Sequence, residues 1–183
     1  MTDATRSRLR ALPSLTGSAP TLDPGSVTAD PVALFLEWLE CAEHAGVPEP
    51  HAMTLSTVDE WGVPDARVLV LKDVDERGWA FAGTKTSVKG RQLDVTAHAA
   101  LTFWWQPLVR SVRVRGAVVE ASREESLADL SARSPAAREG VDADDWTLWR
   151  VVPTRIEFWQ GSVDRRHVRI VFGRENGHWQ LEG

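Results

Sequence analysis

The chain has 183 residues, of which 43% are hydrophobic and 26% charged, and its formal net charge at pH 7 is −5. This composition fits one globular domain with a sizeable core and excludes a disordered chain. An acidic chain is not expected to bind nucleic acid, and no apolar run reaches the length of a membrane span. A single cysteine, Cys41, excludes an intrachain disulfide. With no signal-peptide pattern near the N-terminus, we expect a cytoplasmic protein with no membrane partner.

The N-terminal segment, residues 1–29, mixes Ser, Thr, Pro, Gly and Arg without periodicity, and it predicts a mobile arm. Asp30 and Pro31 then form a helix-start signal. Apolar residues at helical spacing follow, from Phe35 to Ala42, and Gly46 ends the predicted helix. Residues 30–183 are therefore expected to form a single domain.

Short apolar runs separated by turns dominate the rest of the chain. They predict strands over 52–58, 66–74, 79–83, 99–105, 110–121, 148–160, 165–172 and 178–182. Short helices are expected at 86–95 and at 122–133, the second opened by a capping-box pattern, with a loop after it. Many strands and few helices indicate a mainly β fold, an antiparallel barrel with peripheral helices.

The most basic of these strands lies in the stretch IEFWQGSVDRRHVRIVF, residues 156–172. If 165–172 is extended, Arg165, His167 and Arg169 share one face, because alternate strand residues point the same way. A cationic row on a rigid strand suits a small anion, and like charges on one face repel unless an anion lies there. The alternative is a solvated strand face.

Three further stretches carry cations near small or apolar residues. RVLVLKD has Arg67 and Lys72 at its ends, and GTKTSVKG places Ser87 and Lys89 at a helix N-terminus, which suits a phosphate. FWWQPLVRSVRVRG puts two arginines on one strand face. Each has a purely structural alternative: a buried strand with solvated end charges, an ordinary helix cap, or a half-buried strand. No His or Cys spacing is typical of a metal site, so no metal is expected.

Together these stretches resemble the pyridoxamine 5′-phosphate oxidase family of flavoproteins, over about residues 30–133 and 146–182. The most specific motif is IEFWQG followed by RRHVR, which is similar to the family's C-terminal Arg-x-His-x-Arg signature. Its occurrence after RVLVLK, in the family's order, strengthens the resemblance. The resemblance implies a split β-barrel homodimer that binds FMN at the subunit interface.

The resemblance also implies roles for individual residues. The cofactor-binding set is Arg67, Val68, Leu69, Val70, Lys72, Ala82, Gly83, Ser87, Lys89, Ser111, Trp159 and Arg169. Within it, Arg67, Ser87 and Lys89 would hold the FMN phosphate, and Trp159 and Arg169 would come from the other subunit. The substrate-binding set is Lys72, Arg133, Arg165 and His167, of which Arg165 and His167 would be catalytic.

The sequence departs from the family's pattern at several of these positions. Val88 replaces the second cation of the phosphate segment, and Ser111 replaces a glutamine. The substrate segment, which carries a Tyr, an Arg and a Ser in the family, keeps Arg133 but has Asp129 and Ala137 at the other two places. A flavin-contacting segment is missing between Arg133 and Trp146.

The activity implied is that of an FMN-dependent oxidase, which passes a hydride from an amine or alcohol to flavin and then reduces dioxygen to hydrogen peroxide. Two small anionic substrates stay open: pyridoxamine or pyridoxine 5′-phosphate, in pyridoxine biosynthesis, or a reduced secondary metabolite of the phenazine type. A third possibility is a non-catalytic flavin- or vitamer-binding protein. The RRHVR motif argues against a deazaflavin reductase, because it belongs to the oxidase branch.

Overall fold

The computed structural model describes residues 3–23, 25 and 27–182. The strands in this part of the chain are β1 (Ala52–Val58), β2 (Pro64–Val70), β3 (Asp73–Asp75), β4 (Gly78–Thr84), β5 (His98–Trp105), β6 (Arg110–Glu120), β7 (Trp146–Gln160), β8 (Val168–Glu175) and β9 (His178–Glu182). The helices are α1 (Asp3–Ala11), α2 (Pro31–His44), α3 (Val88–Val95), α4 (Arg123–Ala132) and α5 (Pro135–Arg138).

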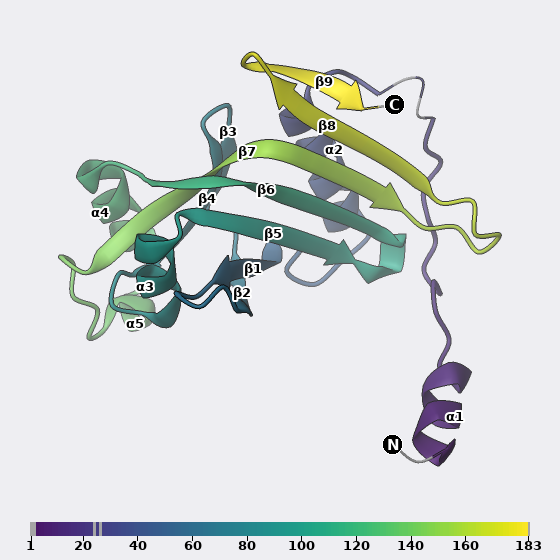
Figure 1. The fold of residues 1–183 in the computed structure, drawn as a ribbon, viewed down its shortest axis with the longest axis horizontal. Helices are drawn as coiled ribbons and strands as arrows, with labels where there is room; N and C mark the ends of the chain where they lie inside the picture. Colours follow the sequence, from purple (N-terminus) through teal and green to yellow (C-terminus); the bar gives the residue numbers. More distant parts are fainter. Residues whose placement is uncertain (1–2, 24, 26, 183) are drawn as a thin grey trace.

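All paired strands are antiparallel, in the order β2-β1-β5-β6-β7-β4-β3. The long strand β7 is where the sheet divides (Figure 1). One edge of β7 pairs with β6; the other pairs with β4 over its first part and with β8 over its last part. A register irregularity near Pro153 lies between these two parts. The predicted antiparallel split barrel with peripheral helices is confirmed.

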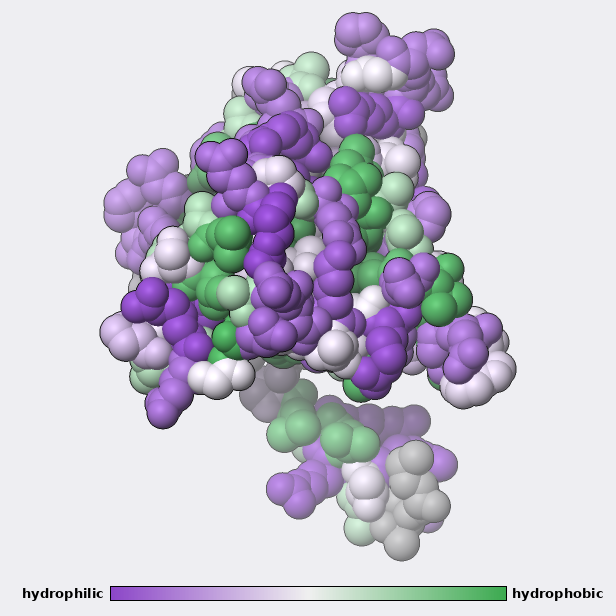
Figure 2. Space-filling model, turned by 90° about the vertical axis from the view of Figure 1, so that its left-hand side faces the viewer, coloured by the Kyte–Doolittle hydropathy of each residue, from purple (hydrophilic) through white to green (hydrophobic). Residues whose placement is uncertain are grey.

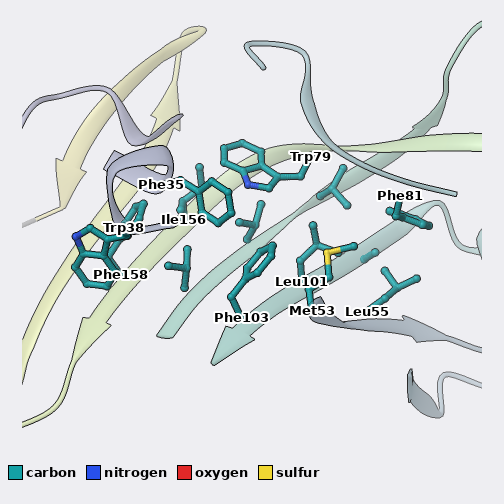
Figure 3. Packing of buried hydrophobic residues seen from close by; sticks show 14 of the residues in the cluster. Phe35, Trp38, Met53, Leu55, Trp79, Phe81, Leu101, Phe103, Ile156 and Phe158 are labelled. Carbon is teal, nitrogen blue, oxygen red and sulfur yellow. The ribbon is translucent and has the colours of Figure 1, made fainter. Parts of the chain in front are cut away.

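Helix α2 begins and packs as the sequence predicts. The Asp30 carboxylate accepts hydrogen bonds from the backbone N–H groups of Val32 and Ala33, and Pro31 occupies the first turn. Its apolar face buries Phe35 and Trp38 against the strands (Figure 3). Aromatic pairs fill this core, including Phe35 with Phe103 at 4.9 Å and Trp38 with Phe158 at 5.2 Å between ring centroids.

The prediction of one continuous strand over 66–74 is wrong, because the strand is interrupted after Val70. Strand β2 ends at Val70, and β3 begins at Asp73 on the opposite side of the strand order. Between them the Leu71 N–H donates to His51 O beside β1, and the Lys72 N–H donates to Ala80 O in β4. The chain changes hydrogen-bonding partner here because it crosses from one side of the barrel to the other. Lys72 therefore lies in the crossing, where a strand-parity argument does not apply.

The predicted strand over 165–172 also begins later than expected, at Val168. Arg165 has a left-handed φ of 65°, and the loop before β8 is tied by Asp164, which accepts hydrogen bonds from Ser162 and Arg166. The prediction that Arg165, His167 and Arg169 share one strand face is therefore wrong. Local side-chain hydrogen bonds compete with the sheet ladder at this point.

The N-terminal segment is more regular than predicted. Asp3–Ala11 is helical, with no buried residue, and stands clear of the barrel (Figures 1 and 2). Further on, the Ser18 N–H donates to Pro107 O at 2.8 Å, and Gln160 Nε2 donates to Pro20 O at 2.8 Å. The division into an arm, 1–29, and one domain, 30–183, stays a prediction.

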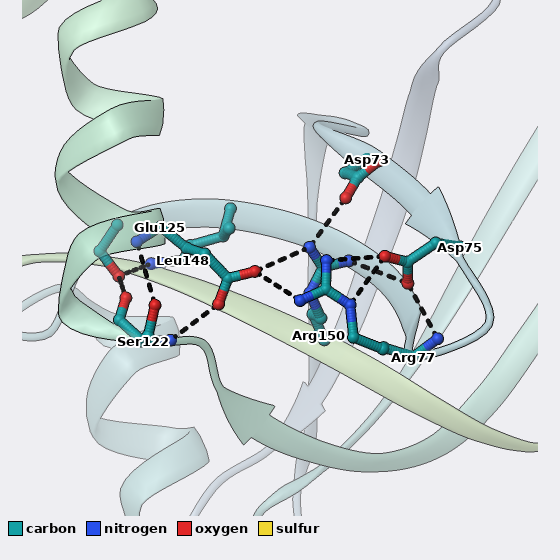
Figure 4. A network of polar contacts seen from close by, with 8 residues as sticks. Asp73, Asp75, Arg77, Ser122, Glu125, Leu148 and Arg150 are labelled. Carbon is teal, nitrogen blue, oxygen red and sulfur yellow. Dashed lines mark hydrogen bonds and ion pairs between the residues drawn. The ribbon is translucent and has the colours of Figure 1, made fainter.

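An ion network fixes α4 to the sheet (Figure 4). The Arg150 guanidinium on β7, whose side chain is 6% exposed, pairs with Asp73, Asp75 and Glu125. Arg77 joins the same group through Asp75 and Glu125. Because Glu125 also closes the capping box of α4, the network sets the position of α4, which carries residues of the candidate site.

Candidate functional site

A cluster of cations and hydroxyls lies where β2, β4 and the N-terminus of α3 meet. Ser87 is the N-cap of α3, and its Oγ accepts from the Gly90 N–H and from Lys89 Nζ at 3.1 Å. Arg67 reaches α3 from β2, where its Nη2 donates to Gln92 Oε1 at 3.0 Å, and its charge helps to lower the pKa of Lys89. The predicted phosphate residues Arg67, Ser87 and Lys89 are thus brought together, at a helix end that favours anions.

The lysine of this cluster is packed over a glycine. A Cβ at Gly83 would collide with Lys89 Nζ and come within 2.6 Å of Cε. Burial, and then the nearby Arg67 charge, hold the pKa of Lys89 below its ordinary value. The half-buried Lys89 cation would be stabilised by an anion beside it, so a phosphate group fits this cluster.

Arg67 is held by polar neighbours that the sequence alone did not single out. Its Nη1 donates to Thr57 Oγ1 at 2.5 Å, and its Nη2 donates to Asp65 Oδ2 at 2.6 Å and to Gln92 Oε1 at 3.0 Å. Gln92, on α3, is 9% exposed and also accepts from the Thr57 hydroxyl. In the sequence, Thr57 could have been found from its inward-facing position in the predicted strand β1. No sequence pattern marks Gln92, because only the fold brings it to Arg67.

Three predicted residues, Ser111, Trp159 and Arg169, form a row across the other end of the sheet together with Trp104, which was not predicted. Trp104, Ser111, Trp159 and Arg169 pair in register across β5, β6, β7 and β8. The Trp104 and Trp159 ring centroids are 6.3 Å apart, and Trp104 is 49% exposed. Two indoles on either side of a small serine make a surface on which a flat ring can pack.

A buried glutamate anchors the arginines of this row. Glu157, with a side chain 8% exposed, accepts from Arg113 Nη2 at 2.7 Å and from Arg169 Nη1 at 3.0 Å. Both arginine side chains are more than half exposed. One carboxylate between two guanidinium groups leaves one positive charge uncompensated, which favours an anion on this face.

His167 lies beside the row, although it is not in the strand. Its ring centroid is 5.1 Å from that of Trp159, and its Nδ1 accepts from the Ser162 N–H at 2.9 Å. That bond leaves Nε2 as the nitrogen that can exchange a proton with a ligand. Arg165 lies in the same loop and is exposed.

The remaining predicted residues meet at the opposite end of β7. Lys72 Nζ is 4.0 Å from Asp129 Oδ1, and Trp146 Nε1 donates to Asp129 Oδ2 at 3.0 Å. The Arg133 guanidinium lies 4.6 Å from the centroid of the Trp146 ring. Lys72 and Arg133 are therefore linked through shared neighbours: Asp129 contacts Lys72 and Trp146, and Arg133 lies over the Trp146 ring.

The two ends of this site are far apart in one chain. Gly83, beside Lys89, pairs with Thr147, and Trp159 is twelve residues further along β7 (147 to 159). We call Arg67, Ser87 and Lys89 the phosphate cluster, and Trp104, Ser111, Trp159 and Arg169 the tryptophan row. At about 3.3 Å per residue, roughly 40 Å of strand separates the two groups. One mononucleotide cannot reach both. Among the described residues, the edge strand β2 pairs with β1 alone. Its other edge, which includes Val68 (70% exposed), Leu69 and Val70, is open to a ligand or another chain.

The fold and these residues define a class: split-barrel proteins with a phosphate cluster and a separate aromatic and cationic row. Residues 40–160 match the family described as "Pyridoxamine 5′-phosphate oxidase", and residues 146–183 match the "Pyridoxine 5′-phosphate oxidase C-terminal dimerisation region". The chain belongs to the pyridoxamine 5′-phosphate oxidase family.

Relatives and solved structures agree with this assignment. The chain is 38% identical to the pyridoxine/pyridoxamine 5′-phosphate oxidase of Thermosynechococcus vestitus, covering 82% of this chain and 86% of that one. It is also 38% identical to the protein of that name from Bordetella petrii, over 88% and 92% of the two chains.

Among solved structures, PhzG from Burkholderia lata, in complex with tetrahydrophenazine-1-carboxylic acid, superposes with a TM-score of 0.83 at 27% identity, over 91% of this chain and 98% of that one. An FMN-binding protein from Nostoc punctiforme shares the fold, with a TM-score of 0.69 at 17% identity, over 88% and 97%. Within the described residues no helix is long and apolar enough to cross a membrane.

Proposed function

We propose that the protein is an FMN-dependent oxidase that works as a homodimer. Each flavin would lie between the phosphate cluster of one chain and the tryptophan row of the other. The observation that carries this proposal is the roughly 40 Å of β7 between two groups that a single flavin must contact. The family's dimerisation region, residues 146–183, contains Trp159 and Arg169 of the row and supports the same arrangement.

In this arrangement each group has a defined task. Arg67, Ser87 and Lys89 would hold the phosphate, with Gly83 leaving room for the lysine. The open edge of β2 would meet the flavin ring with backbone groups, and Trp159 and Arg169 of the second chain would cover it. FMN held there would supply the electron acceptor for the substrate, from which the two electrons would pass to dioxygen.

The chain's own residues would bind and orient the substrate. Arg165 would hold a polar or anionic group, and His167 would move a proton at Nε2, because Nδ1 is occupied by the Ser162 N–H. Lys72 and Arg133, from the other end of β7, would complete the substrate site across the interface. A substrate that contacts both Arg165 and His167 at one end and Lys72 and Arg133 at the other would again need two chains.

Two substrates remain candidates. Pyridoxamine or pyridoxine 5′-phosphate is suggested by the names of the relatives at 38% identity. A reduced phenazine-type carboxylate is suggested by the PhzG structure with its bound ligand. The Lys72–Asp129 ion pair favours the second, since it leaves less positive charge for a phosphate.

The absorbance spectrum of the purified protein tests the proposal most directly. We expect flavin absorption, and mass spectrometry of the ligand released on denaturation should give the mass of FMN. Light scattering should give twice the 20.3 kDa of one chain. A colourless monomer that does not take up added FMN would contradict the proposal, and a yellow dimer that oxidises neither substrate type would favour a non-catalytic flavin-binding protein.

A further inference from the structure

One charged cluster has a composition that bears on which substrate can bind. Lys72 from the β2–β3 crossing, Asp129 and Arg133 from α4 and its C-terminal end, and Trp146 from the start of β7 meet here. We call these four residues the Asp129 cluster. Three separate segments of the chain supply it, so the tertiary structure and not local sequence creates the arrangement.

Asp129 is held firmly in this cluster. Its side chain is 13% exposed, one carboxylate oxygen accepts from Trp146 Nε1 at 3.0 Å, and the other lies 4.0 Å from Lys72 Nζ. The Lys72 side chain is itself only 24% exposed. An ion pair this sheltered is screened by water less than a surface pair. Asp129 therefore offsets part of the Lys72 charge toward a ligand.

Arg133 is the cation that remains. Its guanidinium lies over the Trp146 ring, and its Nε donates to Ala137 O at 3.2 Å. Among the described residues no ion pair involves Arg133, so its charge stays available. The cluster offers one net positive charge beside an indole, and a planar guanidinium matches a carboxylate well.

We infer that Asp129 is a specificity-determining residue, which makes this site prefer a flat ring bearing one carboxylate over a ring bearing a phosphate dianion. A phosphate dianion is best compensated by two cations, and here Asp129 offsets part of the charge of one of the two. The inference rests on the proposed function, because it assigns the cluster to the substrate, and it narrows that function to non-phosphorylated aromatic acids.

Calorimetric titration of the purified protein without oxygen tests this directly. The probes are pyridoxine, pyridoxine 5′-phosphate and phenazine-1-carboxylate. In the wild type, the phosphate group should improve binding of pyridoxine by less than about threefold, and the carboxylate should bind more tightly than either. Asp129→Asn keeps an acceptor for Trp146 and should bind pyridoxine 5′-phosphate at least about tenfold more tightly, with pyridoxine unchanged.

The controls separate local charge from net charge and from misfolding. Asp144→Asn removes the same charge from a side chain that is 96% exposed, and it should change no affinity. Adding Lys72→Met to Asp129→Asn should abolish the gain, because the freed lysine produces it. Strong phosphate preference in the wild type, or no gain in a folded Asp129→Asn protein, would overturn the inference. Absence of flavin would instead overturn the proposed function, and the affinities would still be measurable.

Discussion

At the scale of single residues, the phosphate cluster is the part of the site whose chemistry is most constrained. Lys89 lies over Gly83, touches Ser87 and has its pKa lowered by burial and by Arg67. Such a group gains from binding an anion, because the anion restores the stability of its charged form. The cluster therefore has a physical reason to bind phosphate, and not only a resemblance to a known motif.

Replacing Lys89 by alanine should weaken FMN retention by about tenfold or more, since one charge-assisted contact is worth about 1.5–3 kcal/mol. The FMN dissociation constant, measured by flavin fluorescence, checks this. Lys85→Ala is the matched control, because that lysine is half exposed and pairs with Glu120. Full flavin content in Lys89→Ala would show that the phosphate lies elsewhere.

The residues near β8 should divide between two tasks. Arg169, anchored by Glu157 in the tryptophan row, is expected to serve the flavin, so Arg169→Ala should lose FMN. Arg165→Ala and His167→Ala should stay yellow and lose turnover by about 10²-fold or more, because each positions the substrate. Flavin content and the rate of flavin reduction by pyridoxamine 5′-phosphate and by a dihydrophenazine carboxylate distinguish the two effects.

Arg166→Ala is the control for this series, since Arg166 lies in the same loop, is exposed and pairs with Asp164. It should change neither flavin content nor turnover. If all of the substitutions were silent, within about 0.5 kcal/mol in stability, the loop and row would be a solvated surface and the family resemblance would extend only to the fold.

At the scale of elements, the position of α4 depends on the network around Arg150. Glu125 caps the helix, accepts from the Ser122 N–H and pairs with Arg77 and Arg150. The hydrogen bonds with Ser122, and then the Arg77 guanidinium, lower the pKa of Glu125 to about 2 from an ordinary value of 4.5. The helix that carries Asp129 and Arg133 is thus attached through a carboxylate that must stay ionised.

A depressed carboxylate pKa gives the network a defined pH dependence. The stabilisation by Glu125 should be complete above about pH 4.5 and be lost as the pH falls toward 2, because only the unfolded state takes up the proton in that range. Glu125→Gln should lower the urea midpoint at pH 7 and match the wild type near pH 2. Glu124→Gln, an exposed neighbour, is the control; equal pH profiles for Glu125→Gln and wild type would contradict the role given to Glu125.

At the scale of the whole molecule, the two groups of the proposed flavin site lie at opposite ends of β7, so the proposed site needs two chains. Two chains related by a twofold axis would form two equivalent sites, each with a phosphate cluster from one chain and a row from the other. The exposed Val68 on the edge strand β2, together with the half-exposed Trp104, is apolar surface that such pairing would cover.

A mixed dimer tests this arrangement without any substrate. Lys89→Ala and Arg169→Ala should each lose FMN as homodimers. When the two variants are unfolded together and refolded, a mixed dimer has one site with both defects and one site with neither. Such dimers, isolated by two affinity tags, should recover about one FMN per dimer. No recovery in a correctly refolded mixed dimer would place both residues in the same site of one chain.

The sequence by itself determined the fold class, the helix starting at Pro31 and most strand positions, because apolar periodicity and caps act locally. It also grouped Ser87 and Lys89, because both lie at a predicted helix N-terminus, and it added Arg67 to them through the resemblance to the family. Only the tertiary structure decided where Lys72 and Arg165 lie: one is in a barrel crossing and the other in a turn closed by Asp164, and both break the strand parity.

The charge balance of the site was likewise decided by the fold. The sequence shows Asp129 only as a departure from a family pattern, whereas the structure places its carboxylate against Lys72 and Trp146, residues that lie 57 and 17 positions away (129 − 72 and 146 − 129). The separation of the phosphate cluster from the tryptophan row is also a property of strand length and register. Contacts between distant segments depend on how the whole sheet closes, and no local pattern encodes that.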